Sequence, residues 1–600
     1  MTARESMRVR SLASAMSGAL CIAALGGCGA TDPVEDDAVE RGDLVADRTP
    51  DDGAARGDGE IVEDGLVWDG RIWSVAGAMI PDFSYAGYGF GTRAVPDFAG
   101  ATVVDATSHG VVADDGKDDS AGLLAALDAA RAVDGPVVLQ LPSGRVRLSA
   151  ILPIDRSGLV LRGRGHGEGG TEIHIPRPLS LIDTGGKFDE ITEYLDRFDK
   201  VQREPDQNVE WPFSPYSWTG GFLWVGPEGY RAAAYLEERD RPDEVLAEAV
   251  SGERGGLRLA VASTDGLREG DDVELVWYSR DGEGGGVIRE IYGDTDLDVG
   301  SHHWTFPERG LVRQKTVIAS VEDGAVTLMD PLLHSVSDAA PASLVAWSPL
   351  VDVGIEDLAI TFPEGVSFGH HLEQGFNGIY FTGVRDGWIR DVRIRDADSG
   401  VLTYSSANVT IDNVTTEGER TAHYSVHAGN VHNVLVSDLE VRNPVRHSLS
   451  LNTQSTKTVY QRARVHRDAV LDQHAGSNHQ NLFDQTLVHI DAVEDEGGRA
   501  YAIWDGSGAG YWQPGHGRFN TTYNMEVRVR TGADRDETVV LQGLAEGPDA
   551  RLVGIWGNRD FEIDYRPHPV IADLNTEPTP RSLYDAQLAR RMEEAGGTTR

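Results

Sequence analysis

The stretch IRDVRIRDADSGVLTYSSANVTIDNV, residues 389–414, contains the pattern that decides the fold. Two runs of aliphatic residues alternate with Arg, Asp, Thr or Asn, first at 389–394 and again at 409–414. A further short apolar run, 400–404, lies between them. Because alternation places the aliphatic side chains on one face of an extended chain, each run predicts a β-strand with one buried face.

The same pattern returns along the C-terminal half of the chain. Similar runs lie at 355–360, 434–439, 459–465 and 482–488. From residue 389 on, successive runs start roughly 20 to 26 residues apart. A fixed period of this size indicates a solenoid whose coils stack and pair in parallel. Leucine-rich repeats share the period, but they need a leucine scaffold that this chain lacks. A second short strand is expected in the intervals, at 378–381, 400–404, 424–426, 448–451 and 502–504.

A series of short motifs precedes these repeats. An Asp-rich turn, 114–120, precedes a predicted helix whose apolar positions lie within 123–130. Strands ending in LPSG (141–144) and in RGRG (162–165) follow. In this order of parts, the segments resemble the N-terminal part of the pectate-lyase superfamily. The resemblance covers about residues 66–560. It implies an all-β fold, a right-handed parallel β-helix with an N-terminal capping helix that hides the open end of the solenoid.

The pattern breaks between residues 183 and 345. Apolar runs separated by glycines, at 257–261, 272–276 and 325–328, predict antiparallel strands. We therefore expect an inserted small β-rich module over 183–345, which either shapes a substrate cleft or braces the β-helix from the side. Three further segments are predicted. They are an N-terminal cap with the first coils at 66–182, the main parallel β-helix at 346–570, and a C-terminal tail at 571–600.

The N-terminus has the features of an exported lipoprotein. Basic residues precede a short apolar stretch, 12–25, which is too short to span a bilayer comfortably. It ends in LGGC, which resembles the bacterial lipobox and implies cleavage before Cys28 and a lipid on its sulfur. We expect a signal peptide at 1–28 and an acidic disordered tether at 29–65. The protein should then be anchored to the bacterial cell envelope, on its periplasmic or cell-surface face.

The charge of the chain restricts its partners. Fifty-four basic and 96 acidic residues among 600 give a net charge of −42, which should repel nucleic acid and anionic membrane surfaces. The expected partner is a polysaccharide, and the lipid anchor is the only membrane contact that we expect. Both cysteines, Cys21 and Cys28, lie in the N-terminal segment, so the mature body has no disulfide framework. We expect a monomer.

A column of polar residues appears when the second strands of successive coils are aligned. His427, Asn452, Asp472 and His474 fall within one register slip of one another, so we predict that they form a catalytic group. The segments GHHLEQGFNGI and LDQHAGSNHQNLFD are similar to a bacterial branch of the superfamily, although Ala475 stands where those relatives usually carry a basic residue. Candidate substrate-binding residues are His371, His447, Arg446, Arg467, Arg499, Trp504 and His516.

These residue types favour a polysaccharide lyase. β-Elimination at a uronic acid needs a cation for the carboxylate, a base for the C5 proton and an acid for the leaving oxygen. Histidine is a suitable base near neutral pH, so His427 or His474 could take the proton. An arginine could receive the carboxylate, and the candidates are Arg446, Arg462, Arg464, Arg467 and Arg499.

Two other functions stay open. A glycoside hydrolase of the same fold needs two carboxylates at a fixed separation, and Asp472, Asp484 and Asp505 are the candidates. A non-catalytic glycan-binding protein would use the same histidines and asparagines as structural ladders.

A transition-metal site is not predicted from the spacing of the histidines. His370 and His371 are adjacent, so on a strand they would point to opposite faces, and His423 lies about 13 Å from His427 on a straight strand. The sequence has no Asp-x-Asp-x-Asp-Gly loop for calcium. Ca²⁺ bound by other carboxylates stays open as the one candidate cofactor.

Overall fold

In a computed structural model, the described part of the chain after residue 60 contains many short β-strands and few helices. The predicted signal peptide with Cys28 lies outside the described residues, as does nearly all of the predicted tether. None of the helices in the described part of the chain is long and apolar enough to cross a membrane. The structure describes residues 61–62, 66–68, 73–197, 214–230, 243–294, 298–300, 310–495, 498–505, 513–531, 537–543 and 547–596.

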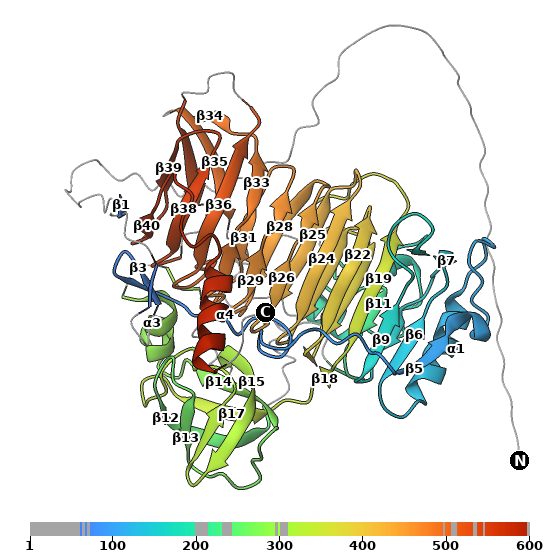
Figure 1. The fold of residues 1–600 in the computed structure, drawn as a ribbon, viewed down its shortest axis with the longest axis horizontal. Coiled ribbons are helices and arrows are strands. Elements are labelled where there is room, and N and C mark those ends of the chain that lie inside the picture. The colour runs from blue at the N-terminus through green and yellow to red at the C-terminus, as the bar shows by residue number, and fades with distance from the viewer. Residues whose placement is uncertain are drawn as a thin grey trace, which may run out of the picture. The chain divides into compact units, whose positions relative to one another are not determined.

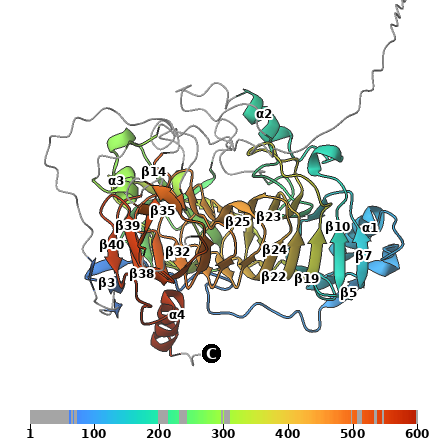
Figure 2. The same cartoon turned by 90° about the horizontal axis from the view of Figure 1, so that it is seen from above.

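Two long sheets form the body of the protein, and successive coils pair in parallel in both (Figure 1). In the larger sheet Ile389 pairs with Ile411, and Ile411 pairs with Val436, one coil further on. Figure 2 shows these strands side by side along the stack of coils. The pairing confirms the predicted parallel β-helix. The 18-stranded sheet consists of β1 (Ile61–Val62), β5 (Thr102–Asp105), β6 (Val137–Gln140), β7 (Gly144–Arg147), β9 (Leu159–Arg162), β10 (Thr171–His174), β19 (Gly354–Thr361), β22 (Trp388–Arg395), β24 (Thr410–Glu417), β26 (Leu435–Ser437), β27 (Glu440–Val441), β29 (Val459–Gln461), β30 (Arg464–Val465), β32 (Leu482–Asp484), β33 (Leu487–Ile490), β36 (Thr521–Val529), β38 (Arg551–Gly557) and β40 (Val570–Ala572).

The second sheet carries the predicted polar column. Its strands follow one another coil by coil, and only the hairpin strand β34 pairs antiparallel among the described residues. The 11-stranded sheet consists of β8 (Leu152–Ile154), β11 (Leu223–Val225), β20 (Asn377–Thr382), β23 (Ser399–Tyr404), β25 (Ala422–Gly429), β28 (Val445–Asn452), β31 (Leu471–His474), β34 (Val493–Asp495), β35 (Gly498–Asp505), β37 (Val539–Gly543) and β39 (Phe561–Asp564).

Aliphatic ladders fill the space inside the coils. Val401, Val426, Leu449 and Leu471 are neighbours in register on four successive strands of the 11-stranded sheet, and all four are fully buried. Each such side chain contributes about 1.5–3 kcal/mol when it leaves water. Trp504 continues this ladder opposite Leu471. The ladder fixes the register of the sheet, because a slip by one residue would expose it.

Helix α1 (Ser120–Arg131) lies at the N-terminal end of the solenoid. Its buried residues Leu123, Leu127 and Ala130 face the first coil, where the helix packs against β5, β6 and β8. The carboxylate of Asp119 accepts hydrogen bonds from the backbone N–H groups of Val112 and Arg147, and so ties the start of the helix to the first strands. The remaining elements are β2 (Val67–Trp68), β3 (Trp73–Val75), β4 (Ala78–Ile80), α2 (Asp189–Arg197), β18 (Leu350–Val351) and β21 (Val384–Arg385).

Six antiparallel strands between residues 245 and 346 close into a barrel. The predicted start of the module at 183 was wrong, because Leu223–Val225 is a strand of the β-helix that pairs with β8 and β20. Short helix α3 (Gly286–Tyr292) also belongs to this insert. The barrel strands are β12 (Val245–Gly252), β13 (Arg258–Val261), β14 (Asp272–Tyr278), β15 (Gly310–Glu322), β16 (Ala325–Leu328) and β17 (Ala342–Ala346).

Buried polar contacts join the barrel to the turns that follow the strands of the 11-stranded sheet. Nζ of Lys315 donates to both oxygens of Asn430, each at 3.0 Å, and Lys315 is completely buried. His432 lies 2.7 Å from Asp330 through its Nε2 atom. These contacts favour the bracing role among the two roles predicted for the module.

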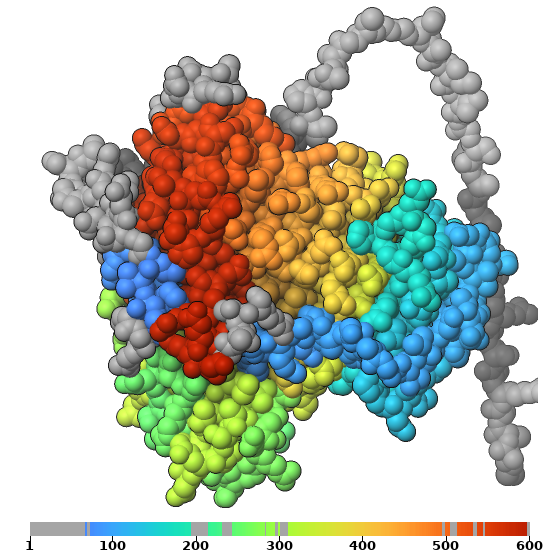
Figure 3. Space-filling model, viewed as in Figure 1, coloured from blue at the N-terminus to red at the C-terminus, as the bar shows by residue number. Residues whose placement is uncertain are grey.

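The two ends of the described chain pack on the side of the solenoid. Figure 3 shows the N-terminal segment crossing the coils between the barrel and α1. In this segment the Gly87 N–H donates to the Asn433 carbonyl at 2.8 Å, and the Tyr88 hydroxyl donates to Asp352 at 2.5 Å. Helix α4 (Leu583–Glu594), in the predicted tail, is docked as well, because Asp484 accepts from the backbone N–H groups at its start.

Candidate functional site

The strands β25, β28 and β31 bring the predicted catalytic group together. His427 pairs with Ser450, and Ser450 with Asp472. On the same strands Asn452 pairs with His474. These residues lie on the face opposite the aliphatic ladder, so the predicted column is present. The side chains are nevertheless largely enclosed, and that of His474 is 13% exposed.

Asp472 is the charged centre of one half of the site. Its Oδ1 atom lies 3.1 Å from Nδ1 of His474 and 3.5 Å from Nδ1 of His447, and Ser450 donates to Oδ2 at 2.6 Å. Burial opposes ionisation, but the two histidines hold the pKa of Asp472 well below its ordinary range. When Nδ1 of His474 carries the proton, its N–H donates to this carboxylate. The basic lone pair of the ring is then on Nε2.

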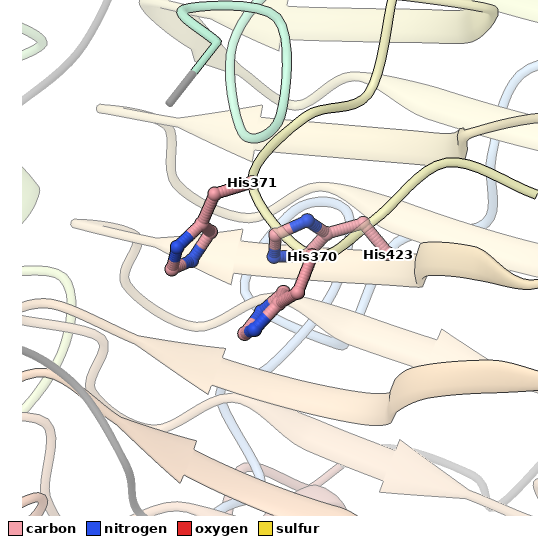
Figure 4. Close-up of side chains that lie close together, drawn as sticks. All are labelled: His370, His371 and His423. Atoms are coloured by element: carbon pink, nitrogen blue, oxygen red, sulfur yellow. The ribbon is translucent and has the colours of Figure 1, made fainter. Parts of the chain in front are cut away.

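The other half of the site comes from the loop that precedes β20. This loop carries His370, His371 and Glu373 to the start of β25, where His423 lies. The rings of His370 and His371 are stacked with centroids 3.9 Å apart, and His370 lies 4.9 Å from His423 (Figure 4). Nδ1 of His423 lies 2.9 Å from Oε1 of Glu373. The two halves meet where Nε2 of His447 lies 3.4 Å from Nε2 of His370.

Three histidines of the site, His370, His371 and His423, favour their neutral forms. Burial lowers the pKa of His371 to about 4. The pKa values of His370 and His423 fall further below the ordinary range, because neighbouring imidazoles reinforce the effect of burial. Burial also raises the pKa of Glu373. The site therefore offers unprotonated imidazole nitrogens, which can act as bases or as metal ligands.

An exposed arginine borders this enclosed group. Arg446 lies one residue before His447 on β28, and its charge acts on His370, His371 and His423. Among the described residues, none forms an ion pair with Arg446. The arginine can therefore receive an anion that approaches from solvent.

His427 and Asn452, which were predicted to be catalytic, are buried. His427 is completely buried, its Nε2 atom lies 3.3 Å from the Tyr404 hydroxyl, and burial lowers its pKa to about 3. The amide of Asn452 donates to the Tyr424 hydroxyl at 3.4 Å. These two residues support the site from behind and do not border solvent.

Four predicted substrate-binding residues lie away from the site or are paired. Trp504 belongs to the core ladder, where its indole N–H donates to Thr522, so its place in the polar column was wrong by one residue of register. His516 is buried against the Tyr565 hydroxyl at 2.6 Å and cannot touch a substrate. The remaining two are arginines in ion pairs, Arg499 with Glu537 at 2.9 Å and Arg467 with Glu419 at 3.6 Å.

The carboxylates that a hydrolase would need are only partly assembled. Asp484 belongs to the 18-stranded sheet and is buried under α4, where it accepts from the Ser582 hydroxyl at 2.6 Å. Asp505 pairs with Asp472 in register, and its side chain is outside the described part of the structure. Glu373, which the sequence analysis did not select, is the second described carboxylate at the site.

Two sets of side chains have the geometry of a metal site. His370, His371 and His423 can each offer a nitrogen within 4.8 Å of the others, and so can His447, Asp472 and His474 with an oxygen from the aspartate. The spacing argument against a metal was wrong for His370 and His371, because they lie in a loop. His371 has a φ of +63°, in the left-handed region, and this turns its ring onto that of His370.

Sequence reasoning missed His370, His423 and Glu373 as site residues. The signal for His370 and Glu373 was the Gly-His-His-Leu-Glu-Gln-Gly segment, in which glycines at 369 and 375 frame two histidines and a glutamate. Flanking glycines predict a loop and not a strand, so adjacent residues need not point to opposite faces.

The chain was compared with known proteins. No family model matches it, and no curated protein matches it. Similar solved structures include the tailspike protein gp49 from Pseudomonas phage LKA1, at 13% identity and TM-score 0.44 over 78% of this chain and 81% of that chain. The A-module of the Azotobacter vinelandii mannuronan C-5 epimerase AlgE4 has 13% identity and TM-score 0.30 over 79% and 96%. A DFA-IIIase from Arthrobacter chlorophenolicus A6 has 14% identity and TM-score 0.31 over 82% and 89%. These similarities are distant, and the strand pairing of the chain itself establishes the fold.

Proposed function

We propose that the protein cleaves an extracellular uronic-acid polysaccharide by β-elimination at the histidine site. The observation that carries this proposal is the arrangement of Asp472, His474 and Arg446 on neighbouring strands of the 11-stranded sheet. Asp472 orients His474 at the edge of the site. Arg446 is exposed, has no ion-pair partner among the described residues, and acts through its charge on His370, His371 and His423.

Each of these groups supplies one requirement of the reaction. Arg446 neutralises the uronate carboxylate, which makes the C5 proton more acidic. His474 takes that proton through Nε2, because Asp472 holds Nδ1 at 3.1 Å. The C4–O bond then breaks, and the departing oxygen is protonated by the imidazolium or by water. The product carries a new C4–C5 double bond.

Glycoside hydrolysis is the second candidate function. One observation favours it: the environments of Glu373 and Asp472 move their pKa values in opposite directions, upward for the glutamic acid and downward for the aspartate. Two carboxyl groups separated in this way could serve as general acid and general base. Glu373 is buried beside His423, however, and the elimination proposal uses the more accessible groups.

We also propose that the protein is exported and held at the cell envelope through a lipid on Cys28. The support comes from the LGGC sequence at the end of a short apolar segment. A polysaccharide outside the cell would then be within reach of an anchored domain.

The test of the proposed reaction is an assay with a panel of uronic-acid polysaccharides. We expect ultraviolet absorbance from unsaturated ends to rise with the wild-type protein, and to disappear with His474→Ala. His466→Ala is the matched control, because His466 directly follows β30 of the other sheet and pairs with Glu440. New reducing ends without this absorbance would show hydrolysis and contradict elimination. Binding of the polysaccharide without cleavage would contradict both reactions.

A further inference from the structure

Four imidazole rings converge at the junction of the loop with β25 and β28. The His370 ring lies 3.9 Å from that of His371, 4.9 Å from that of His423 and 5.6 Å from that of His447, measured between centroids. The Nε2 atoms of His370 and His447 are 3.4 Å apart. Donor nitrogens around a tetrahedral zinc ion, with bonds of about 2.0–2.1 Å, lie about 3.3–3.4 Å from one another. This pair already has that separation.

Two of the four imidazoles have a carboxylate at the nitrogen that does not face the cluster centre. Oε1 of Glu373 lies 2.9 Å from Nδ1 of His423, and Oδ1 of Asp472 lies 3.5 Å from Nδ1 of His447. A carboxylate on the far nitrogen fixes the tautomer of a metal-binding histidine and makes its other nitrogen a better donor. Histidines that stack only for structural support do not need a carboxylate at the outer nitrogen.

The backbone of the loop is held in a form that suits the cluster. His371 has a φ of +63°, which a residue with a β-carbon adopts at a cost. The Ser214 N–H donates to the His371 carbonyl at 2.6 Å, and Gly375 and Phe376 donate through their N–H groups to Asp398 at 3.0 Å. The surrounding structure therefore imposes the conformation that stacks His371 on His370.

We propose that His370, His371, His423 and His447 bind one divalent transition-metal ion of the zinc class. Imidazole nitrogens suit zinc, copper and nickel, whereas calcium and magnesium need oxygen ligands. Asp472 and Glu373 act through the histidines and are positioning residues for the metal. The proposal goes beyond the proposed function, because metal binding is measured without a polysaccharide.

The first experiment measures the metal content of the purified protein. The protein is stripped with a chelator, titrated with zinc alone, and freed of unbound ion by gel filtration. We expect one zinc ion per chain, and we expect cobalt(II) in its place to give the intense visible bands of a four-coordinate complex. A folded protein that retains no zinc would overturn the proposal, as would cobalt spectra typical of six-coordinate oxygen ligation.

Variants then test the ligand assignment. His371→Asn and His423→Asn should each lower zinc affinity at least 100-fold, and Glu373→Gln should lower it about 10- to 100-fold, as is usual for a residue that supports a ligand. His466→Asn, directly after β30 of the opposite sheet, is the matched control, and His474→Asn should keep one zinc per chain. Circular dichroism of the metal-free variants checks that they fold. Wild-type affinity in both ligand variants, or an equal loss in His474→Asn, would overturn the assignment.

Discussion

Nδ1 of His423 lies 2.9 Å from Oε1 of Glu373, although 50 residues separate the two in the chain. His423 belongs to strand β25, and Glu373 belongs to the loop that precedes β20. The contact joins one coil of the β-helix to a loop that closes over its outer face. The candidate site is therefore built only when the coils have stacked and this loop has docked on them.

Replacement of Asp472 by asparagine should impair catalysis more than folding. Asp472→Asn removes the charge that orients His474, so we expect the elimination rate to fall about 100-fold or more, the usual contribution of a positioned base. Asp468→Asn, an exposed position in the same coil, should keep the wild-type rate. The measurement is the initial rate on a cleaved polysaccharide. Equal rates in Asp472→Asn and Asp468→Asn would refute the role of Asp472.

Acid should destabilise the protein in part through His427. Burial lowers the pKa of this histidine from an ordinary value of 6.5 to about 3 in the folded state. The unfolded chain therefore binds the proton more readily between pH 6.5 and 3, and folding stability is lost as pH falls through that range, by up to about 1.4 kcal/mol per pH unit. Thermal midpoints of wild type and His427→Gln, measured from pH 7 to 4, should show a shallower decline in the variant. Parallel curves would show that His427 does not contribute.

The barrel should not be separable from the β-helix. Lys315 is fully buried between them, contacts Asn430, and lies 3.2 Å from the carboxylate of Glu274. Lys315→Met removes a partner of the buried Glu274 carboxylate and leaves part of its negative charge uncompensated. We therefore expect the free energy of unfolding to fall by about 3–5 kcal/mol and the thermal midpoint to fall with it. Lys117→Met, at a side chain that is 82% exposed, should change stability by less than about 0.5 kcal/mol. A midpoint for Lys315→Met equal to that of Lys117→Met would argue against a brace.

The two cysteines allow a matched test of the lipid anchor. In a bacterial host fed labelled palmitate, the wild-type protein should take up label and sediment with membranes. Cys28→Ser should lose the label and appear in the soluble fraction, whereas Cys21→Ser should behave as wild type. Label that persists in Cys28→Ser would contradict the predicted lipobox.

The fold was predictable from the sequence because a β-helix repeats one simple rule. Alternation at 389–394 and 409–414 sets which side chains point inward, and the observed pairing of Ile389 with Ile411 follows that rule. The column of His427, Asp472 and His474 was predictable for the same reason, since register carries a position from one coil to the next. The prediction failed for Trp504, which pairs with Leu471 and therefore faces the core. A shift of one residue in register moves a side chain from the polar face to the core.

The other half of the site could not be read from strand periodicity. His370, His371 and Glu373 lie in a loop, where the backbone conformation of His371 decides the direction of its ring. The docking of residues 571–596 was also missed, because Asp484 anchors α4 through contacts about a hundred residues apart in the chain. Such long-range polar contacts leave no periodic trace in the sequence.

The most direct test of the proposed reaction compares two neighbouring arginines on one polysaccharide. Arg446 has no ion-pair partner among the described residues, whereas Arg442, which is also exposed, lies near Glu417 and Glu440. A charge-assisted contact to a carboxylate is worth about 1.5–3 kcal/mol, so Arg446→Gln should raise KM about 10-fold or more for formation of the unsaturated product. Arg442→Gln should match the wild type, and His474→Ala should form no product. Unsaturated product at the wild-type rate in both Arg446→Gln and His474→Ala would contradict elimination at this site.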